Sequence, residues 1–227
     1  MKKLLCILLI SGYCFSVSAQ QSDFKYELYI GAKGGMTLSQ VRFYPNVQTS
    51  FLQGNTGGLM FRFISEPHIG FQVEFNYIQK GWQEKPFTGQ YAATTYFHQL
   101  NYVDIPVLTH VNIGKKAMRF ILDLGPEVSY LISEDQGFKP LAGINPSLDG
   151  YKEYYGNKID TPVDILFTGG IGMEFHSKGG SIISLEGRVF YSLPNIFDTK
   201  KYTYKGSQSN GAQVTLAYLL QLNKHRK

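Results

Sequence analysis

The chain has 227 residues, of which 43% are hydrophobic, 15% aromatic and 17% charged. The hydrophobic content excludes a disordered chain, and the charged content is well below the roughly 25% usual for soluble domains. Both cysteines lie in the first 14 residues, so the rest of the chain has no disulfide, no cysteine metal site and no cysteine nucleophile. The formal net charge of +5 falls to +3 without Lys2 and Lys3, which is too small to indicate nucleic-acid binding.

The first 19 residues have the three parts of a secretory signal peptide. Lys2 and Lys3 precede the apolar run 4–10, and small residues end the segment at Ala19. We therefore expect a signal peptide at 1–19 and a single domain at 20–227. After this leader, no stretch approaches the roughly 18 uncharged apolar residues that a membrane helix needs.

The remaining sequence alternates between apolar and polar residues with a period of two, which is typical of β-strands. In the clearest run, Ile69, Phe71 and Val73 alternate with Gln72 and Glu74. Most of these segments reach the roughly 9 to 11 residues that a tilted strand needs to cross a bilayer. In chain order, the eight predicted strands are 26–39, 55–64, 69–77, 98–112, 118–130, 163–175, 182–192 and 211–222.

The predicted connections alternate between short and long. The turns at 65–67, 114–116 and 177–180 are tight. The four segments between the other strand ends are long, and they are 40–54, 81–97, 132–161 and 193–210. Since short periplasmic turns and long extracellular loops are typical of outer-membrane barrels, the pattern predicts an all-β, eight-stranded antiparallel up-and-down transmembrane β-barrel.

The polar face of these strands decides between a lipocalin-like soluble barrel and a membrane barrel. This face is rich in Gly, Ser and Thr, and its few charges have both signs, which suits the crowded lumen of a narrow barrel. On the other face no strand centre carries a charge, so we expect this face to contact lipid. Lys33 and Arg62 are further candidates for the lumen, where we predict a structural charge network of Glu74, Asp104, Arg119, Asp123, Glu127, Glu174, Glu186 and Arg188.

Aromatic residues near the predicted strand ends suggest interfacial girdles. The expected girdle residues are Tyr77, Trp82, Tyr96, Phe97, Tyr102, Tyr130, Tyr191 and Tyr218. Pro106 and Pro126 fall inside predicted strands, and we expect a β-bulge at each of them.

Four short segments resemble a known family. The segment Tyr102-Val103-Asp104-Ile105-Pro106-Val107-Leu108 is similar to a middle-strand motif of the PorT-like outer-membrane β-barrel family of Bacteroidota. Supporting similarities lie at 31–39, 124–131 and 169–175. The resemblance implies an outer-membrane location and a barrel fold. The family takes its name from a component associated with type IX protein secretion, so a role as an accessory subunit of such a system is one implied alternative.

The sequence suggests no catalytic, cofactor-binding or metal-binding residues. Among the histidines, only His98 is expected beside the outer loops, and no Ser and acid partners for an enzyme are evident. An ion path through the lumen charges is the alternative to a structural network, although side chains should fill a barrel of only eight strands. The long loop 132–161 is either a contact surface or an ordinary solvated loop, and its candidate contact residues are Phe138, Tyr151, Lys152, Tyr154 and Tyr155.

Together these features predict a non-enzymatic, integral outer-membrane protein with a plugged polar lumen. We expect it to be a monomeric barrel in contact with outer-membrane lipid, with loops that contact another envelope protein or a surface ligand. A narrow passive pore is the second alternative. We expect no cofactor and no nucleic acid partner.

Overall fold

The computed structural model describes residues 24–85, 94–115, 117–140 and 155–223, and the predicted signal peptide lies outside these ranges. The described residues contain nine β-strands and no helix long and apolar enough to cross a membrane. The strands are β1 (Glu27–Tyr44), β2 (Thr49–Ser50), β3 (Leu52–Ile64), β4 (Ile69–Glu84), β5 (Thr94–Lys115), β6 (Met118–Pro140), β7 (Val163–His176), β8 (Ser181–Ser192) and β9 (Gly206–Gln221).

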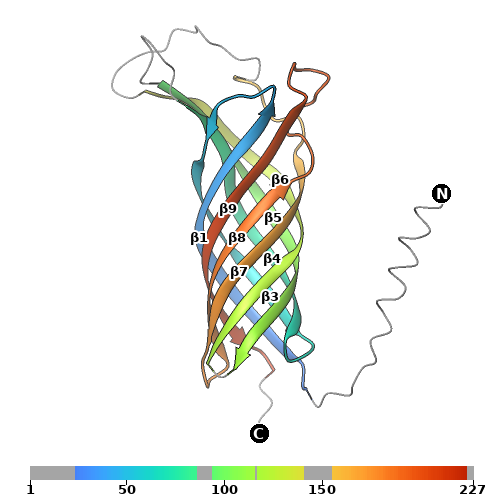
Figure 1. The fold of residues 1–227 in the computed structure, drawn as a ribbon. Coiled ribbons are helices and arrows are strands. Elements are labelled where there is room, and N and C mark those ends of the chain that lie inside the picture. The colour runs from blue at the N-terminus through green and yellow to red at the C-terminus, as the bar shows by residue number, and fades with distance from the viewer. Residues whose placement is uncertain (1–23, 86–93, 116, 141–154, 224–227) are drawn as a thin grey trace, which may run out of the picture.

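The eight longer strands form a closed antiparallel ring (Figure 1). Strand β1 pairs with β3 on one side and with β9 on the other, and the β4–β5 pairing completes the circuit. Every long strand therefore has two neighbours, which removes free edges along the ring. These strands correspond to the eight predicted ones. The two-residue β2, which pairs with Gln83 and Glu84 of β4, was not predicted.

Short turns and long connections lie at opposite ends of this cylinder (Figure 1). Residues 65–68 join β3 to β4, and 177–180 join β7 to β8. Gly180 adopts φ 84°, a left-handed conformation that glycine accepts without strain in a tight turn. By the usual arrangement of outer-membrane barrels, we refer to the short-turn end as periplasmic and to the other end as extracellular.

Several strands run further toward the extracellular end than predicted. Strand β6 continues to Pro140, and β5 begins at Thr94, so parts of the predicted loops 81–97 and 132–161 are paired strands. The predicted loops 40–54 and 193–210 likewise lose residues to β1, β2, β3 and β9. In β1, β4 and β5 the extensions were missed because their apolar residues, such as Val41, Trp82 and Leu100, turn inward, against the polarity of the neighbouring membrane segments. The extension of β9 at 206–210 was missed because it has no apolar side chain to alternate.

The bulges predicted at Pro106 and Pro126 are not observed. Pairing between β5 and β6 keeps one register on both sides of the prolines, from Pro106↔Glu127 to Thr109↔Leu124, and the ladder is only interrupted between these pairs. The register shift lies instead between Asn101 and Tyr102, where β5 and β6 leave the section with the apolar exterior. Each proline has no N–H to donate to the neighbouring strand, so the ladder lacks that hydrogen bond and the strands keep their register without a bulge.

Side chains alternate between the lumen and the outer surface. Large apolar side chains cover the outside of the ring between the two ends, with Ile171 68% exposed and Leu216 58% exposed. The inward side chains at the same levels include buried Lys, Arg, Glu and Asp residues. Apolar residues form two interior clusters near the ends of the described ring: a small one around Tyr29 and Leu219 at the periplasmic end, and a larger one around Trp82 at the extracellular end. Between the clusters, a few apolar side chains are buried beside the charges, and they are Leu108, Ile121, Leu166 and Phe190.

Candidate functional site

The centre of the lumen is organised around the Glu74 carboxylate of β4. The Arg188 guanidinium donates to both of its oxygens, at 3.0 and 3.1 Å, and Lys33 Nζ lies 2.5 Å from Oε2. Asn76 Nδ2 also donates to Oε2 at 2.9 Å. Arg188 in turn holds Glu186 through two hydrogen bonds of 2.8 and 2.9 Å. Because this group is almost fully buried, each charge depends on its partners for the solvation that water would otherwise provide.

A second branch leads from Glu74 toward the periplasmic end. Gln72 Nε2 donates to Glu74 Oε1 at 2.6 Å, and its side-chain oxygen accepts from Arg62 Nε at 2.7 Å. Arg62 Nη1 lies 2.5 Å from Glu174 Oε1, and His176 Nε2 lies 3.1 Å from the other Glu174 oxygen. Five strands, β1, β3, β4, β7 and β8, are therefore cross-linked through one continuous polar chain across the lumen.

A separate group of charges lies around Lys80, closer to the extracellular end. Lys80 Nζ donates to Glu127 Oε1 at 3.2 Å and to Ser129 Oγ at 3.0 Å, and Ser129 Oγ donates to Asp104 Oδ1 at 2.7 Å. The ammonium also lies over the rings of Tyr102 and Phe190, at 5.2 and 5.1 Å from their centroids. Lys80 thus joins the polar lumen to the aromatic cluster above it.

The predicted network is therefore divided into several groups. Asp123 pairs with His110 at 2.7 Å. Arg119 is only half-buried, and its hydrogen bond within the described part of the chain goes to Asn112 Oδ1 at 3.4 Å, away from any carboxylate. The other predicted members, Glu74, Asp104, Glu127, Glu174, Glu186 and Arg188, belong to the two larger groups described above.

The predicted charge network leaves out Lys80 and His110, although both are buried beside its members. Lys80 is six residues after Glu74, so strand parity places both on one face, and this signal was available. His110 likewise shares parity with Asp104. The pairing of His110 with Asp123 was not available, because it depends on the register between β5 and β6.

An aromatic cap fills the interior at the extracellular end. Trp82 packs against His98, Phe43 and Phe197, with ring centroids 4.7, 5.5 and 6.1 Å away. Val41 and Phe43 of β1, Leu100 and Tyr102 of β5 and Ile196 of the β8–β9 connection are also buried there. The interior is therefore closed above the charged section by side chains from strands and from a connecting segment.

This cap corrects part of the predicted aromatic girdle. Trp82, Tyr96 and Tyr102 are at most 1% exposed and belong to the cap. Four of the predicted girdle residues do lie outside, and they are Tyr77, Tyr130, Tyr191 and Tyr218. The error has a simple cause: Trp82 has the parity of Glu74, and Tyr102 has the parity of Asp104, so these rings had to turn inward with the charges.

The predicted loop contact residues fall into two sets. Tyr151, Lys152 and Tyr154 lie outside the described residues. Phe138 and Tyr155 pack into the cap, where the Tyr155 ring stacks on Tyr96 with centroids 4.1 Å apart. Burial and the hydrogen bond from Tyr155 to the Glu84 carboxylate raise the pKa of the Tyr155 hydroxyl, so this phenol stays protonated as a donor.

His98, the outer candidate for catalysis, is enclosed in the same cap. Its Nε2 lies 3.0 Å from Glu134 Oε2, an acid partner that the sequence reasoning did not identify. Its Nδ1 lies 3.4 Å from the Tyr96 hydroxyl, and the side chain is fully buried beneath Trp82. No serine hydroxyl contacts His98 within the described ranges. Among these same residues, no group of three or more His, Cys, Asp or Glu side chains could hold a metal ion.

An ion pair fastens the connection between β8 and β9 to the segment before β7. Lys201 Nζ contacts Asp160 Oδ1, and the backbone N–H of Asp198 donates to Asp160 Oδ2 at 3.1 Å. Burial alone would raise the pKa of the Asp160 carboxyl, but these two donors outweigh it and hold the pKa below its ordinary value. The pair lies at the rim of the cap.

The closed antiparallel ring, its apolar exterior and its charged lumen define an outer-membrane β-barrel. The chain belongs to the family described as "outer membrane protein beta-barrel domain", which matches residues 18–198. We therefore assign the protein to the outer membrane. No functionally curated protein matches the sequence.

Solved structures with a similar fold are outer-membrane proteins of low sequence identity. OprG of Pseudomonas aeruginosa is 8% identical, with a TM-score of 0.53 over 87% of this chain and 97% of OprG. Ail, the attachment invasion locus protein of Yersinia pestis, is 10% identical, with a TM-score of 0.42 over 86% of this chain and 99% of Ail. Neisserial surface protein A is 8% identical, with a TM-score of 0.42 over 86% of this chain and 98% of that protein.

Proposed function

We propose that this protein is a non-enzymatic, eight-stranded up-and-down barrel with a closed lumen, and that its extracellular section contacts another envelope protein or a surface ligand. The observation that carries this proposal is the filling of the lumen at three successive levels. An apolar cluster lies at the periplasmic end, buried ion pairs occupy the middle, and the aromatic cap covers the extracellular end. A barrel built this way presents surfaces instead of a passage.

The closed lumen argues against the alternative of a narrow passive pore. Planar-bilayer recordings of the refolded protein test this directly. We expect no stepwise conductance from the wild-type protein, because an ion would have to separate Arg188 from Glu74 and then displace the rings around Trp82. Discrete conductance steps from the wild-type protein would overturn the closed-lumen proposal and favour the pore.

The surroundings of His98 support a structural role over a catalytic one. Its partner Glu134 also accepts a hydrogen bond from the backbone N–H of Ile159 at 3.1 Å, so the pair fastens the 155–159 segment to β6. A substrate would have to displace Trp82 to reach this imidazole. Mass spectrometry of lipids from cells that produce the protein tests this proposal. A lipid modification that is present with the wild-type protein and absent with His98→Ala would overturn it.

The contact role is tested by pull-down from detergent-solubilised envelopes. A variant with Lys139→Glu and Lys158→Glu reverses two charges at the extracellular end, and Lys25→Glu with Lys178→Glu is the matched change at the periplasmic end. We expect a partner that the wild-type protein captures, that the periplasmic variant retains and that the extracellular variant loses. Equal capture by both variants would contradict extracellular contact.

Membership in the PorT-like subgroup is a further part of the proposal, together with cleavage of a signal peptide at 1–19. The segment behind the resemblance lies in β5, where Asp104 belongs to the group around Lys80. Co-purification of the protein with other envelope components would support the alternative that it is an accessory subunit of a secretion system. Isolation as a lone monomer after crosslinking would count against that alternative and leave the barrel proposal intact.

A further inference from the structure

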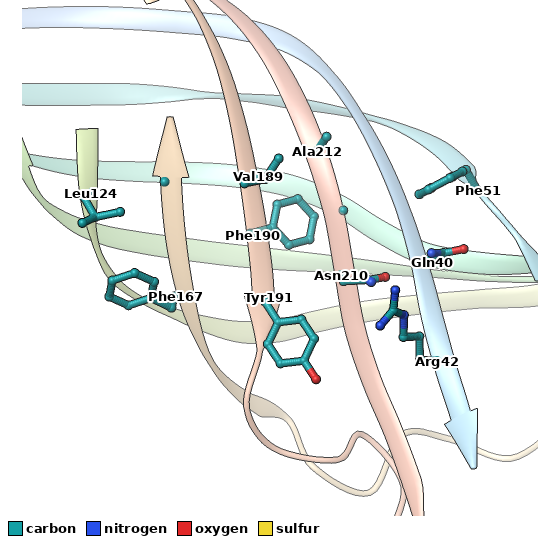
Figure 2. A pocket seen from close by; sticks show the side chains of 12 residues that line it. Gln40, Arg42, Phe51, Leu124, Phe167, Val189, Phe190, Tyr191, Asn210 and Ala212 are labelled. Carbon is teal, nitrogen blue, oxygen red and sulfur yellow. The ribbon is translucent and has the colours of Figure 1, made fainter. Parts of the chain in front are cut away.

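The outer wall of the barrel has a groove near the extracellular boundary of its apolar band. Its volume is about 720 Å³, and it extends over the outward faces of β6 to β9 and β1. Figure 2 shows Leu124 and Phe167 on one side, Phe51 on the other, and Arg42 and Gln40 toward the extracellular end. None of the ionised side chains of the lumen groups lines the groove, and Phe190, whose ring also lies beside the Lys80 ammonium, is the residue that the groove and the group around Lys80 share.

Small outward residues form the apolar part of the groove. The pairings Leu124↔Gly169, Gly169↔Val189 and Val189↔Ala212 place four outward positions in one cross-strand row. Gly169 and Ala212 leave space between the larger Leu124 and Val189 side chains, which are 47% and 62% exposed. The row is therefore a depression with apolar walls, suited to a hydrocarbon chain.

The chemistry of the groove changes in steps toward the extracellular end. The next row pairs Phe167 with Tyr191, Tyr191 with Asn210 and Asn210 with Gln40, so side-chain amides follow the apolar row. The row after that pairs Gln208 with Arg42, and the Tyr191 hydroxyl donates to Gln208 at 2.8 Å. Leu38 of β1 pairs with Ala212 and extends the apolar row. Apolar, amide and guanidinium groups thus succeed one another along β1 at Leu38, Gln40 and Arg42, a spacing of four residues from the first to the last.

This succession has the dimensions of a lipid. Four residues of strand span about 13 Å, or about 10 Å along the membrane normal for a strand tilted by about 40°. This is comparable to the distance from the upper acyl region of a lipid to a phosphate in its headgroup. Arg42 is exposed, and no carboxylate among the described residues pairs with it, so its guanidinium can donate two hydrogen bonds to a phosphate.

The opposite wall of the barrel offers a contrast at the same level. There, Asn55 donates to Gln79, Gln79 donates to Asn101, and Asn101 donates to Ser133, so these outward amides satisfy one another. In the groove, by contrast, the side-chain oxygen of Asn210 is buried at the wall and has no hydrogen-bond partner within the described part of the chain. The wall that carries the exposed Arg42 guanidinium is therefore also the wall that carries the unsatisfied Asn210 amide oxygen.

We propose that this groove binds a phosphorylated, acylated glycolipid of the outer leaflet. In this site, an acyl chain lies over Gly169 and Ala212. The sugar and its amide-linked groups lie beside Asn210 and Gln40, and Arg42 binds the phosphate. The site goes beyond the role proposed above, because it needs neither the lumen nor an extracellular partner.

Native mass spectrometry of the full refolded chain in detergent tests the site. The probe is a hexa-acylated glucosamine disaccharide carrying two phosphates, and the comparison probe is the same lipid without phosphates. We expect the wild-type protein to retain one phosphorylated probe and to bind the dephosphorylated one at least about tenfold more weakly, since hydrogen bonds to charged groups are the stronger ones.

Two variants remove the two halves of the site. Arg42→Gln should weaken binding of the phosphorylated probe about tenfold and abolish the preference for phosphate. Gly169→Leu should weaken both probes, because its side chain fills the depression; a Cβ at this position would lie 3.0 Å from the flexible end of Leu124. Migration of the unheated protein on gels shows whether each variant has folded.

Matched controls place the same changes outside the groove. Gly187→Leu is an outward substitution on β8, where a Cβ would meet only the Ile171 backbone oxygen at 4.0 Å, and Lys178→Gln removes a cation from a periplasmic turn. Both controls should bind like the wild-type protein. The proposal is overturned if the wild-type protein retains no probe, if it retains both probes equally, or if Arg42→Gln and Gly169→Leu bind as tightly as their controls.

Discussion

The membrane section and the extracellular section of this barrel have opposite polarity. In the membrane section, Glu74 and Arg188 lie inside while Leu185 and Leu216 face outward. In the extracellular section, Trp82 and Leu100 lie inside, and Gln99 and Asp135 face outward on the same sheet. Continuous strands change from one arrangement to the other within a few residues. The solvent around the barrel, lipid or water, therefore determines which side chains each section can place inside.

The two sections also differ in what holds them together. Between strands of the membrane section, cross-lumen ion pairs replace apolar packing, because lipid tails give no hydrophobic drive toward the interior. The extracellular section packs like a soluble domain, with rings in contact and burial as the main favourable term. The same kind of substitution should therefore change the free energy of unfolding by different amounts in the two sections.

The largest effect is expected from Arg188→Met in the membrane section. This change leaves the buried Glu74 and Glu186 carboxylates without their shared guanidinium. We expect the free energy of unfolding in lipid vesicles to fall by about 3–5 kcal/mol, measured by urea titration. Arg42→Met, in vesicles without phosphorylated glycolipid, is the control and should change it by less than about 0.5 kcal/mol. Similar losses from both variants would mean that the lumen charges are not a packed network.

A smaller loss is expected when a charge is placed on the lipid-facing side. Leu216→Lys should lower the free energy of unfolding by about 2–4 kcal/mol, because the ammonium would lie in hydrocarbon. Gln208→Lys puts the same side chain on the same face of β9, eight residues closer to the extracellular end, and should cost about 0–1 kcal/mol. If the two lysines proved equally tolerated, the outward face of β9 would not contact lipid at residue 216.

A single methylene group should distinguish the cap from the lipid-facing surface. Ile78 is fully buried in the cap, so Ile78→Val should cost about 0.5–1.5 kcal/mol. Ile183 is 48% exposed on the outer wall, where lipid tails replace the lost contacts, and Ile183→Val should have little effect. Thermal unfolding of both variants in one lipid gives the comparison, and equal shifts in the transition would argue against a packed cap.

The smallest effect concerns the rim of the cap at low pH. In the folded protein the pKa of Asp160 is below its ordinary value. At a pH above that ordinary value, the ionised carboxylate therefore makes its full contribution to the stability of the rim. This contribution is lost as the pH falls through the folded pKa. NMR of the 193–205 segment in micelles should show the Asp198 amide signal shifting on acidification. Asp160→Asn should show no such transition, and an identical transition in that variant would assign it to another group.

Most of the ring could be predicted from residue alternation. The runs from Ile69 to Tyr77 and from Val163 to Phe175 keep one polarity throughout, so their period and length indicate membrane strands. Polarity reverses beyond Tyr77, where Ile78 and Trp82 continue on the face that bears Glu74. A rule that assigns loops where the membrane pattern stops therefore ends these strands too early.

The charge groups were only partly predictable for a different reason. Strand parity indicates which charges face the lumen, and it places Glu74, Glu174 and Arg188 there. It does not indicate which charges meet, because contacts such as Arg62 with Glu174 join strands far apart in the sequence across the lumen. The height of each residue depends on strand register and tilt, which alternation leaves undetermined.

Site-directed spin labelling tests the reversal of polarity most directly. Both cysteines of the chain lie in the first 14 residues, so a protein produced from residue 20 onward has no thiol of its own, and single cysteines introduced into its barrel give unambiguous labels. Labels at Leu185 and at Asp135 both point outward, one in each section, and Ser184 provides an inward position beside Leu185. We expect oxygen dissolved in lipid to relax the label at Leu185, a water-soluble nickel chelate to relax the label at Asp135, and neither to relax the label at Ser184. Strong nickel relaxation at Leu185, or oxygen relaxation at Ser184 equal to that at Leu185, would contradict the inside-out membrane section.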